Sequence, residues 1–186
     1  LQLAESIAPG SPFARQATGQ RAMVLTNLGR SDAAIALARS ILVDPLSRAP
    51  EKVYAYSAIT VALAQSGRFG EALAQAREGM PLALQIRDEL PATGGGILIG
   101  AAIAWFLSGD FAALDGVIGA IYRTAAEQGD PFLGVWAHFL ARGDLARGRL
   151  ADAERRASEA VALLRLHDPG LLLPWALAVL AQIAAQ

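Results

Sequence analysis

Gly67-Arg68-Phe69-Gly70-Glu71-Ala72 is one of four short segments that share a single pattern of residues. The other three are Gly29-Arg30-Ser31-Asp32-Ala33-Ala34, Gly109-Asp110-Phe111-Ala112-Ala113-Leu114 and Gly148-Arg149-Leu150-Ala151-Asp152-Ala153. The leading glycines are 38, 42 and 39 residues apart along the chain. A recurrence at this period indicates similar structural units that stack on one another.

Each leading glycine is expected in the tight turn between two helices, because a residue without Cβ adopts an open backbone conformation at little cost. Two, five, nine and twelve residues after the glycine, apolar or small residues recur, which places them on one face of a helix. Seven residues before the glycine stands a small side chain: Ala22, Thr60, Ala102 or Ala141. The pattern therefore predicts a first helix packed closely against a second.

Helix starts are marked by Asp130-Pro131 and Asp168-Pro169, since aspartate caps a helix and proline fits its first turn. The expected helices are 12–28, 31–43, 50–66, 69–87, 96–108, 111–128, 131–147, 150–166 and 171–185. The fold class is all-α: a right-handed superhelix of about 4.5 antiparallel helix pairs with a period of about 40 residues, forming a single domain over 1–186. The segment 94–107 is apolar on all sides and should be the most buried helix.

Composition limits the possible partners of the chain. Hydrophobic residues make up 54% and charged residues 18%, which is typical of a globular protein. Sixteen basic and seventeen acidic residues are spread without a basic patch, so direct contact with nucleic acid is not expected. The chain has no cysteine and only His138 and His167 as imidazoles, so neither a metal nor a cofactor is expected.

The apolar run 97–107 is shorter than a membrane span requires, so no membrane segment is expected. Because the chain has no cysteine to form a disulfide, a cytoplasmic location is the simplest interpretation. Fifteen of the sixteen basic residues are arginine, which favours a GC-rich, bacterial genome.

The segment 67–72 resembles the second half of the tetratricopeptide repeat (TPR), in which a glycine precedes an aromatic residue and then an alanine. The period of about 40 residues departs from the tetratricopeptide period of about 34. Repeats of this longer kind, rich in Ala, Leu and Arg, resemble the helical-repeat region of large ATP-binding transcriptional regulators of the LuxR family, related to the maltose-regulon activator. The segments 146–164 and 171–185 carry this second resemblance.

In that family the repeats lie between an ATPase and a helix-turn-helix domain and receive an inducer or a partner protein. The resemblance implies that this chain is a sensor module and a fragment of a longer protein, with no catalytic residues of its own. A generic tetratricopeptide scaffold that joins proteins without a transcriptional role is the alternative. An all-α enzyme is a second alternative, but no serine or cysteine nucleophile accompanies His138 and Asp144.

In tetratricopeptide stacks the first helices line a concave groove, and the resemblance implies that a protein or small-molecule effector binds there. The residues assigned to the groove are Tyr54, Ser57, Gln65, Ile99, Ile103, Phe106, His138, Arg142 and Trp175. Its apolar middle offers burial, and Arg142 either grips a carboxylate or phosphate or pairs with the nearby Asp144. Alternatively, neighbouring helices simply cover Ile99, Ile103 and Phe106.

Overall fold

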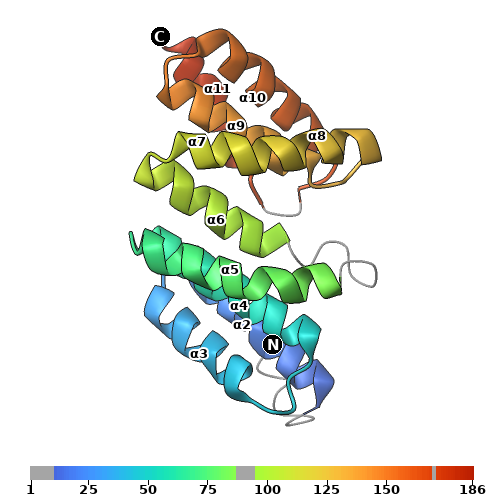
Figure 1. The fold of residues 1–186 in the computed structure, drawn as a ribbon. Helices are drawn as coiled ribbons and strands as arrows, with labels where there is room; N and C mark the ends of the chain where they lie inside the picture. Colours follow the sequence, from blue (N-terminus) through green and yellow to red (C-terminus); the bar gives the residue numbers. More distant parts are fainter. Residues whose placement is uncertain (1–10, 87–94, 169–170) are drawn as a thin grey trace. The chain divides into compact units, whose positions relative to one another are not determined.

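The computed structural model describes residues 11–86, 95–168 and 171–186, and all regular secondary structure within them is helical (Figure 1). The expected all-α class is therefore confirmed. The chain divides into two compact units, with unit 1 ending at Leu107 and unit 2 beginning at Ser108. Each unit is described by itself.

Unit 1 is built from five described helices. They are α2 (Pro12–Asn27), α3 (Ser31–Val43), α4 (Ala49–Gln65), α5 (Phe69–Gln85) and α6 (Gly95–Ser108), the last of which ends at the unit boundary. Unit 2 contains α7 (Phe111–Ala113), the π-helical turn η1 (Leu114–Ile118), α8 (Gly119–Gln128), α9 (Leu133–Ala146), α10 (Leu150–Leu164) and α11 (Leu173–Ala184). Because α7, η1 and α8 follow one another without a break, the nine expected helices are all present.

Most helix ends lie within a residue or two of their expected positions, and the differences have local causes. The Asp130 carboxylate accepts a hydrogen bond from the backbone N–H of Phe132 at 2.7 Å, which forms a turn, and α9 begins only at Leu133. Asp168 similarly accepts from the backbone N–H groups at 172 and 173, where α11 begins. The expected helix end at residue 87 lies outside the described residues, as does residue 94, the first residue of the apolar segment 94–107.

The repeat register read from the sequence is confirmed in both units. The leading glycines all adopt a positive φ between 71° and 77°, the left-handed conformation that favours glycine. The small residues seven positions before them, Ala22, Thr60, Ala102 and Ala141, are all 0% exposed. In the second helices, the residues five positions after the glycine are also fully buried: Ala34, Ala72, Leu114 and Ala153.

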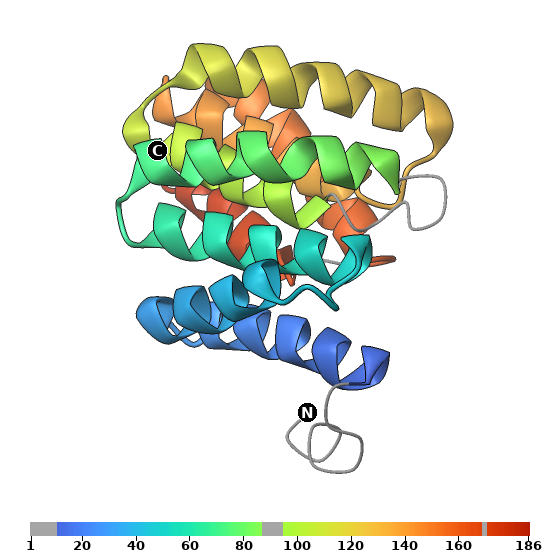
Figure 2. The same ribbon diagram turned by 60° about the horizontal axis from the view of Figure 1, so that its bottom comes forward.

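In unit 1, glycines and small side chains let the helices approach closely. A Cβ on Gly100 of α6 would lie 2.6 Å from Thr60 Cγ2 of α4, and one on Gly79 of α5 would lie 2.6 Å from the ring of Tyr56 of α4. The helices α2 and α3 lie side by side at the bottom of Figure 2. They pack against each other, and each also packs against α4, with Ala22 in the shared core. Backbone proximity, rather than large side chains, therefore determines the packing.

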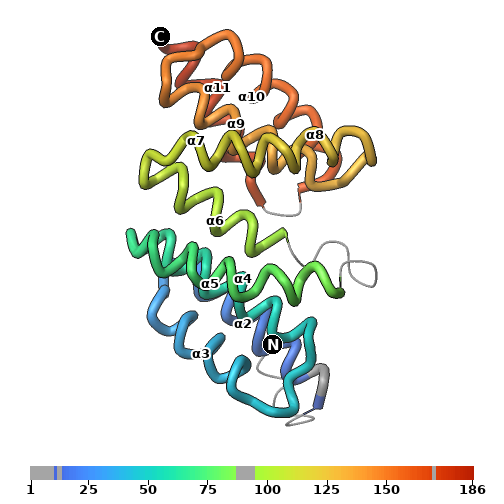
Figure 3. Tube along the Cα trace, viewed as in Figure 1, coloured from blue at the N-terminus to red at the C-terminus, as the bar shows by residue number. Residues whose placement is uncertain are grey.

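In unit 2, α9 packs against α10, α11, α8 and η1. A Cβ on Gly134 at its start would lie 3.0 Å from Leu163 of α10, and one on Gly143 near its end would lie 3.0 Å from Leu114 of η1. The course from α9 through α10 to α11 can be followed as a tube in Figure 3. The helix α9 is accordingly the centre of this unit.

The expectation that the apolar helix of residues 94–107 is the most buried was wrong. Of the fourteen residues of α6, six are buried, whereas α4 buries eleven of seventeen and α9 ten of fourteen. The apolar composition of a helix sets how much free energy its burial can contribute, but the helices packed around it decide how much of its surface is buried.

Candidate functional site

The α4 residues that the sequence assigned to the groove have unequal access to solvent. Tyr54 is half-buried beside α2, since a Cβ on Gly19 would lie 3.1 Å from its Cβ. Ser57 is only 3% exposed; its hydroxyl donates to the Val53 carbonyl at 2.9 Å, and its side chain faces Gly96 of α6. Gln65 is exposed at the end of α4. The available polar group here is therefore Gln65, with part of Tyr54.

Ile99, Ile103 and Phe106 on α6 are all half-buried. Ile103 packs against the core cluster of unit 1 that contains Ile59 and Ala104. The apolar middle of the assigned groove is thus partly core and partly accessible surface in unit 1.

The remaining assigned residues, His138, Arg142 and Trp175, belong to unit 2. His138 is 1% exposed, and burial, with a smaller effect of Arg142, lowers the pKa of its imidazole to about 3. Arg142, one turn later, is half-buried, and desolvation lowers its pKa from the ordinary value. Trp175 on α11 is 60% exposed. His138 and Arg142 are neighbours on one helix face, and the assignment of all nine residues to one groove stays a prediction.

His138 does not form the His–Asp pair that a general base would require. Neither ring nitrogen has a hydrogen-bond partner within the described part of the chain, and the indole nitrogen of Trp136, two residues earlier, is likewise buried without one. The Asp144 carboxylate is occupied by arginines instead. Burial keeps the imidazole neutral, which does not suit proton transfer near neutral pH.

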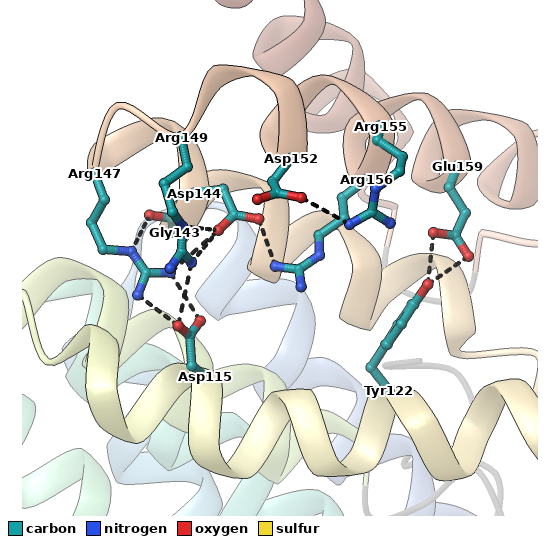
Figure 4. A network of polar contacts seen from close by, with 10 residues as sticks. All are labelled: Asp115, Tyr122, Gly143, Asp144, Arg147, Arg149, Asp152, Arg155, Arg156 and Glu159. Carbon is teal, nitrogen blue, oxygen red and sulfur yellow. Dashed lines mark hydrogen bonds and ion pairs between the residues drawn. The ribbon is translucent and has the colours of Figure 1, made fainter.

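Asp144, near the end of α9, is the centre of a network that the sequence did not reveal (Figure 4). It is 0% exposed and accepts hydrogen bonds from three arginines. Arg149 donates to Oδ1 through Nε at 2.7 Å and also through Nη2, and Arg147 Nη2 lies 3.4 Å from the same oxygen. Arg156 of α10 donates to Oδ2 at 2.5 Å. The buried charge is therefore paired and hydrogen-bonded on both oxygens.

A second carboxylate, Asp115 of η1, extends the network to a third helical segment. Arg147 binds it with two hydrogen bonds, from Nη1 to Oδ2 at 2.6 Å and from Nη2 to Oδ1 at 2.9 Å. These bonds hold the pKa of Asp115 below its ordinary value. Arg147 also lies over the ring of Phe111, 5.2 Å from its centroid, and Arg149 Nη2 reaches Asp115 Oδ2 at 3.3 Å.

Further along α10, Glu159 accepts hydrogen bonds from the hydroxyl of Tyr122 on α8 at 2.7 and 2.8 Å. Burial, and then the neighbouring carboxylate, raise the pKa of this tyrosine. Arg155 and Asp152 form an exposed pair on the outer face of α10. Glu159 and Tyr122 thus attach α8 to α10 at a second point, as Figure 4 shows.

The network holds η1, α9 and α10 together through ion pairs and hydrogen bonds. Its three arginines and two aspartates saturate one another, so neither carboxylate is placed to act as a base or nucleophile. Among residues 11–86, 95–168 and 171–186, no group of three or more His, Asp or Glu side chains is arranged to hold a metal ion.

One signal for the network is present in the repeat frame. Four residues before the leading glycine, the other repeats carry Leu25, Leu63 and Trp105, whereas the fourth carries Asp144. Eight residues after the glycine, the other repeats carry Leu37, Gln75 and Val117, whereas the fourth carries Arg156. The acidic residue at 144, where every sister repeat is apolar, is the signal for a buried ion pair.

None of the helices in the described residues is long and apolar enough to cross a membrane. Comparisons with protein-family models, with curated proteins and with solved structures found no match to this chain.

Proposed function

We propose that this chain is a recognition module without catalytic activity, in which helix pairs of tetratricopeptide type stack into one right-handed superhelix. The repeat itself carries the proposal. Four glycine turns with positive φ and four fully buried small residues recur in register, so each repeat is the same structural unit. Stacked units of this kind present extended surfaces, which repeat proteins use to bind other molecules.

The biological context we propose is the sensor region of a bacterial LuxR-family ATP-binding transcriptional regulator, working in the cytoplasm. The Ala-, Leu- and Arg-rich repeats, with an Asp-Pro pair a few residues before each of the last two first helices, support it. A generic scaffold that joins proteins is the alternative. The complete gene distinguishes them, since the regulator requires a Walker motif before these repeats and a helix-turn-helix after them.

The effector is a protein or a small molecule that contacts the assigned first-helix residues. Arg142 suits an anionic group, because its guanidinium is half-buried and desolvation strengthens hydrogen bonds to a carboxylate or phosphate. A ligand that binds only the folded chain raises its melting temperature, and the rise grows with the logarithm of the ligand concentration above the Kd.

The test is a thermal-shift titration with inorganic phosphate and with succinate as small-anion probes, on the full chain and on two variants. Arg142→Gln removes the charge, and Tyr54→Phe removes only a hydroxyl, so neither leaves a cavity. We expect an anion to raise the melting temperature of the parent chain and of Tyr54→Phe but not of Arg142→Gln. An equal rise in all three, or in none, contradicts the role of Arg142.

A further inference from the structure

Two positions of the repeat are apolar in unit 1 and polar in unit 2. Six and thirteen residues after the leading glycine, the first two repeats carry Ile35, Leu42, Leu73 and Met80. All four are buried or partly buried in the core of unit 1. At the same two positions the third repeat carries Asp115 and Tyr122. The packing of η1 and α8 on α9 and α10, which we call the polar interface, therefore differs in chemistry from its counterparts.

Asp115 and Tyr122 attach one helical segment to the fourth repeat at two points. They are seven residues apart, which is two helical turns, so they share a face. Figure 4 shows both side chains extending from η1 and α8 toward the residues of the fourth repeat. Asp115 accepts hydrogen bonds from Arg147 at 2.6 and 2.9 Å, and the Tyr122 hydroxyl donates to Glu159 at 2.7 Å. We call these the two polar contacts of the interface.

The apolar contacts of the polar interface hold the helices together but do not fix their alignment. Leu114 and Ile118 of η1 are 0% exposed, and a Cβ on Gly143 of α9 would lie 3.0 Å from Leu114. Along α8 the buried residues are Gly119 and Ala125, neither of which has a large side chain. Because hydrophobic burial is non-directional, small residues allow one helix to slide or turn on another at little cost.

The two polar contacts penalise such a movement. A shift of α8 by four residues in either direction would bring an apolar side chain, Ile118 or Ala126, opposite Glu159. In the same shift Arg147 would lose its carboxylate partner. Hydrogen bonds and ion pairs are directional, and a partly buried charge without a partner is costly. Selecting one register among several is the best-attested use of polar groups in a protein core.

We propose that the two polar contacts set the register and the angle at which η1 and α8 stack on the fourth repeat. Without them the helices stay packed, but not in a single arrangement. Arg147 and Asp115 keep 23% and 35% of their side-chain surface exposed, so water can replace either partner when the contact breaks. In a repeat stack, the rotation between neighbouring repeats determines the curvature of the surface. The polar interface thus fixes the shape that unit 2 offers to any molecule it recognises.

The test measures the distance between two spin labels in the full chain by double electron–electron resonance. The chain has no cysteine, so labels attach only where cysteine is introduced. The labelled positions are Ala120→Cys on α8 and Ala162→Cys on α10, both of which are exposed. The distance distribution is compared between this labelled chain and the same chain with Asp115→Leu and Tyr122→Phe. The two substitutions remove both polar contacts and keep side chains of similar size.

We expect one narrow distance distribution in the labelled chain. In the double variant the distribution should widen, or gain a second distance, by an amount on the order of one helical turn, about 5 Å. Asp152→Asn is the matched control, because it breaks an exposed ion pair with Arg155 on the same α10, and it should leave the distribution narrow. Far-UV circular dichroism should show the same helix content in all three chains.

Tyr122→Phe alone decides the question if the double variant does not fold. It removes only a hydroxyl, and α8 can then turn about the remaining contact at Asp115, so the distribution should still widen. A folded variant that loses stability but keeps the narrow distribution would overturn the proposal, since the contacts would then add stability without selecting a register. Equal widening by Asp152→Asn would also overturn it. Neither outcome depends on whether Arg142 binds an anion.

Discussion

Replacing Asp144 by asparagine should destabilise unit 2 by more than any exposed charge change in the same helices. The parent carboxylate is 0% exposed and accepts from Arg156 on one oxygen and from Arg149 on the other. An asparagine keeps one acceptor oxygen, but its NH₂ group would face the guanidinium of Arg149 or of Arg156. Both groups are hydrogen-bond donors, so no bond can form between them. Arg156 then loses the carboxylate oxygen that it binds, while Arg147 and Arg149 still share the carboxylate of Asp115.

The size of the loss follows from the burial of the partners. Removing one member of a fully buried ion pair costs about 3–5 kcal/mol. Here Arg149 and Arg156 keep 42% and 24% of their side-chain surface exposed, so water screens part of the effect. We therefore expect a loss of about 2–3 kcal/mol. Asp152→Asn, which breaks the exposed pair with Arg155, is the matched control and should cost less than about 0.5 kcal/mol.

The assay is urea unfolding followed by far-UV circular dichroism and by tryptophan fluorescence. Because the chain holds two compact units, the two probes are fitted for separate transitions, and the loss is assigned to the one that shifts. A double substitution, Asp144→Leu with Arg156→Leu, places at these positions the leucines that the first repeat carries at 25 and 37. It should be at least about 1 kcal/mol more stable than Asp144→Asn. If Asp144→Asn costs no more than Asp152→Asn, the network does not hold these helices together.

Two further outcomes follow from the packing of the same chain. Gly100→Ala should cost about 1–3 kcal/mol in unit 1, because the added Cβ would meet Thr60 Cγ2 at 2.6 Å, while Gly70→Ala has open space and should be neutral or stabilising in the same denaturant titration. The pKa of His138 is about 3 in the folded chain and about 6.5 when unfolded, so the unfolded state binds the proton more tightly and stability falls as the pH drops from about 6.5 towards 3. Near pH 5 the loss should be about 2 kcal/mol. His138→Leu should remove this pH dependence, and His167→Gln should retain it. A parent chain that is as stable at pH 5 as above pH 6.5 contradicts a buried neutral imidazole.

Local signals account for the parts of the fold that the sequence predicted. A glycine at 67 or 148 ends one helix whatever surrounds it, and small residues spaced by turns of a helix mark the face that packs. Helix starts were less accurate, because the Asp130 side chain bonds to a backbone N–H two residues later and delays α9. The predicted register at Ala102 is confirmed by its complete burial.

The candidate site was harder to predict because its features depend on residues distant in sequence. Ser57 reads as a polar surface residue of a first helix, yet it is covered where Gly96 of α6 approaches it. The sequence shows Asp144 as one charge near a helix end, but its carboxylate is paired with Arg156, twelve residues later, and with Arg147, which also binds Asp115 in another helical segment. The spacing of apolar residues predicts which face of a helix points inward, but not which charged side chains from other helices pair at that face.

The boundary between the two compact units falls at Leu107 and Ser108, beside the Gly109 turn, and so lies inside the third repeat. Unit 2 accordingly begins with a second helix and ends with a first one, α11. A gene that grew by copying segments of 38 to 42 codons would therefore produce compact units out of phase with the copied segment.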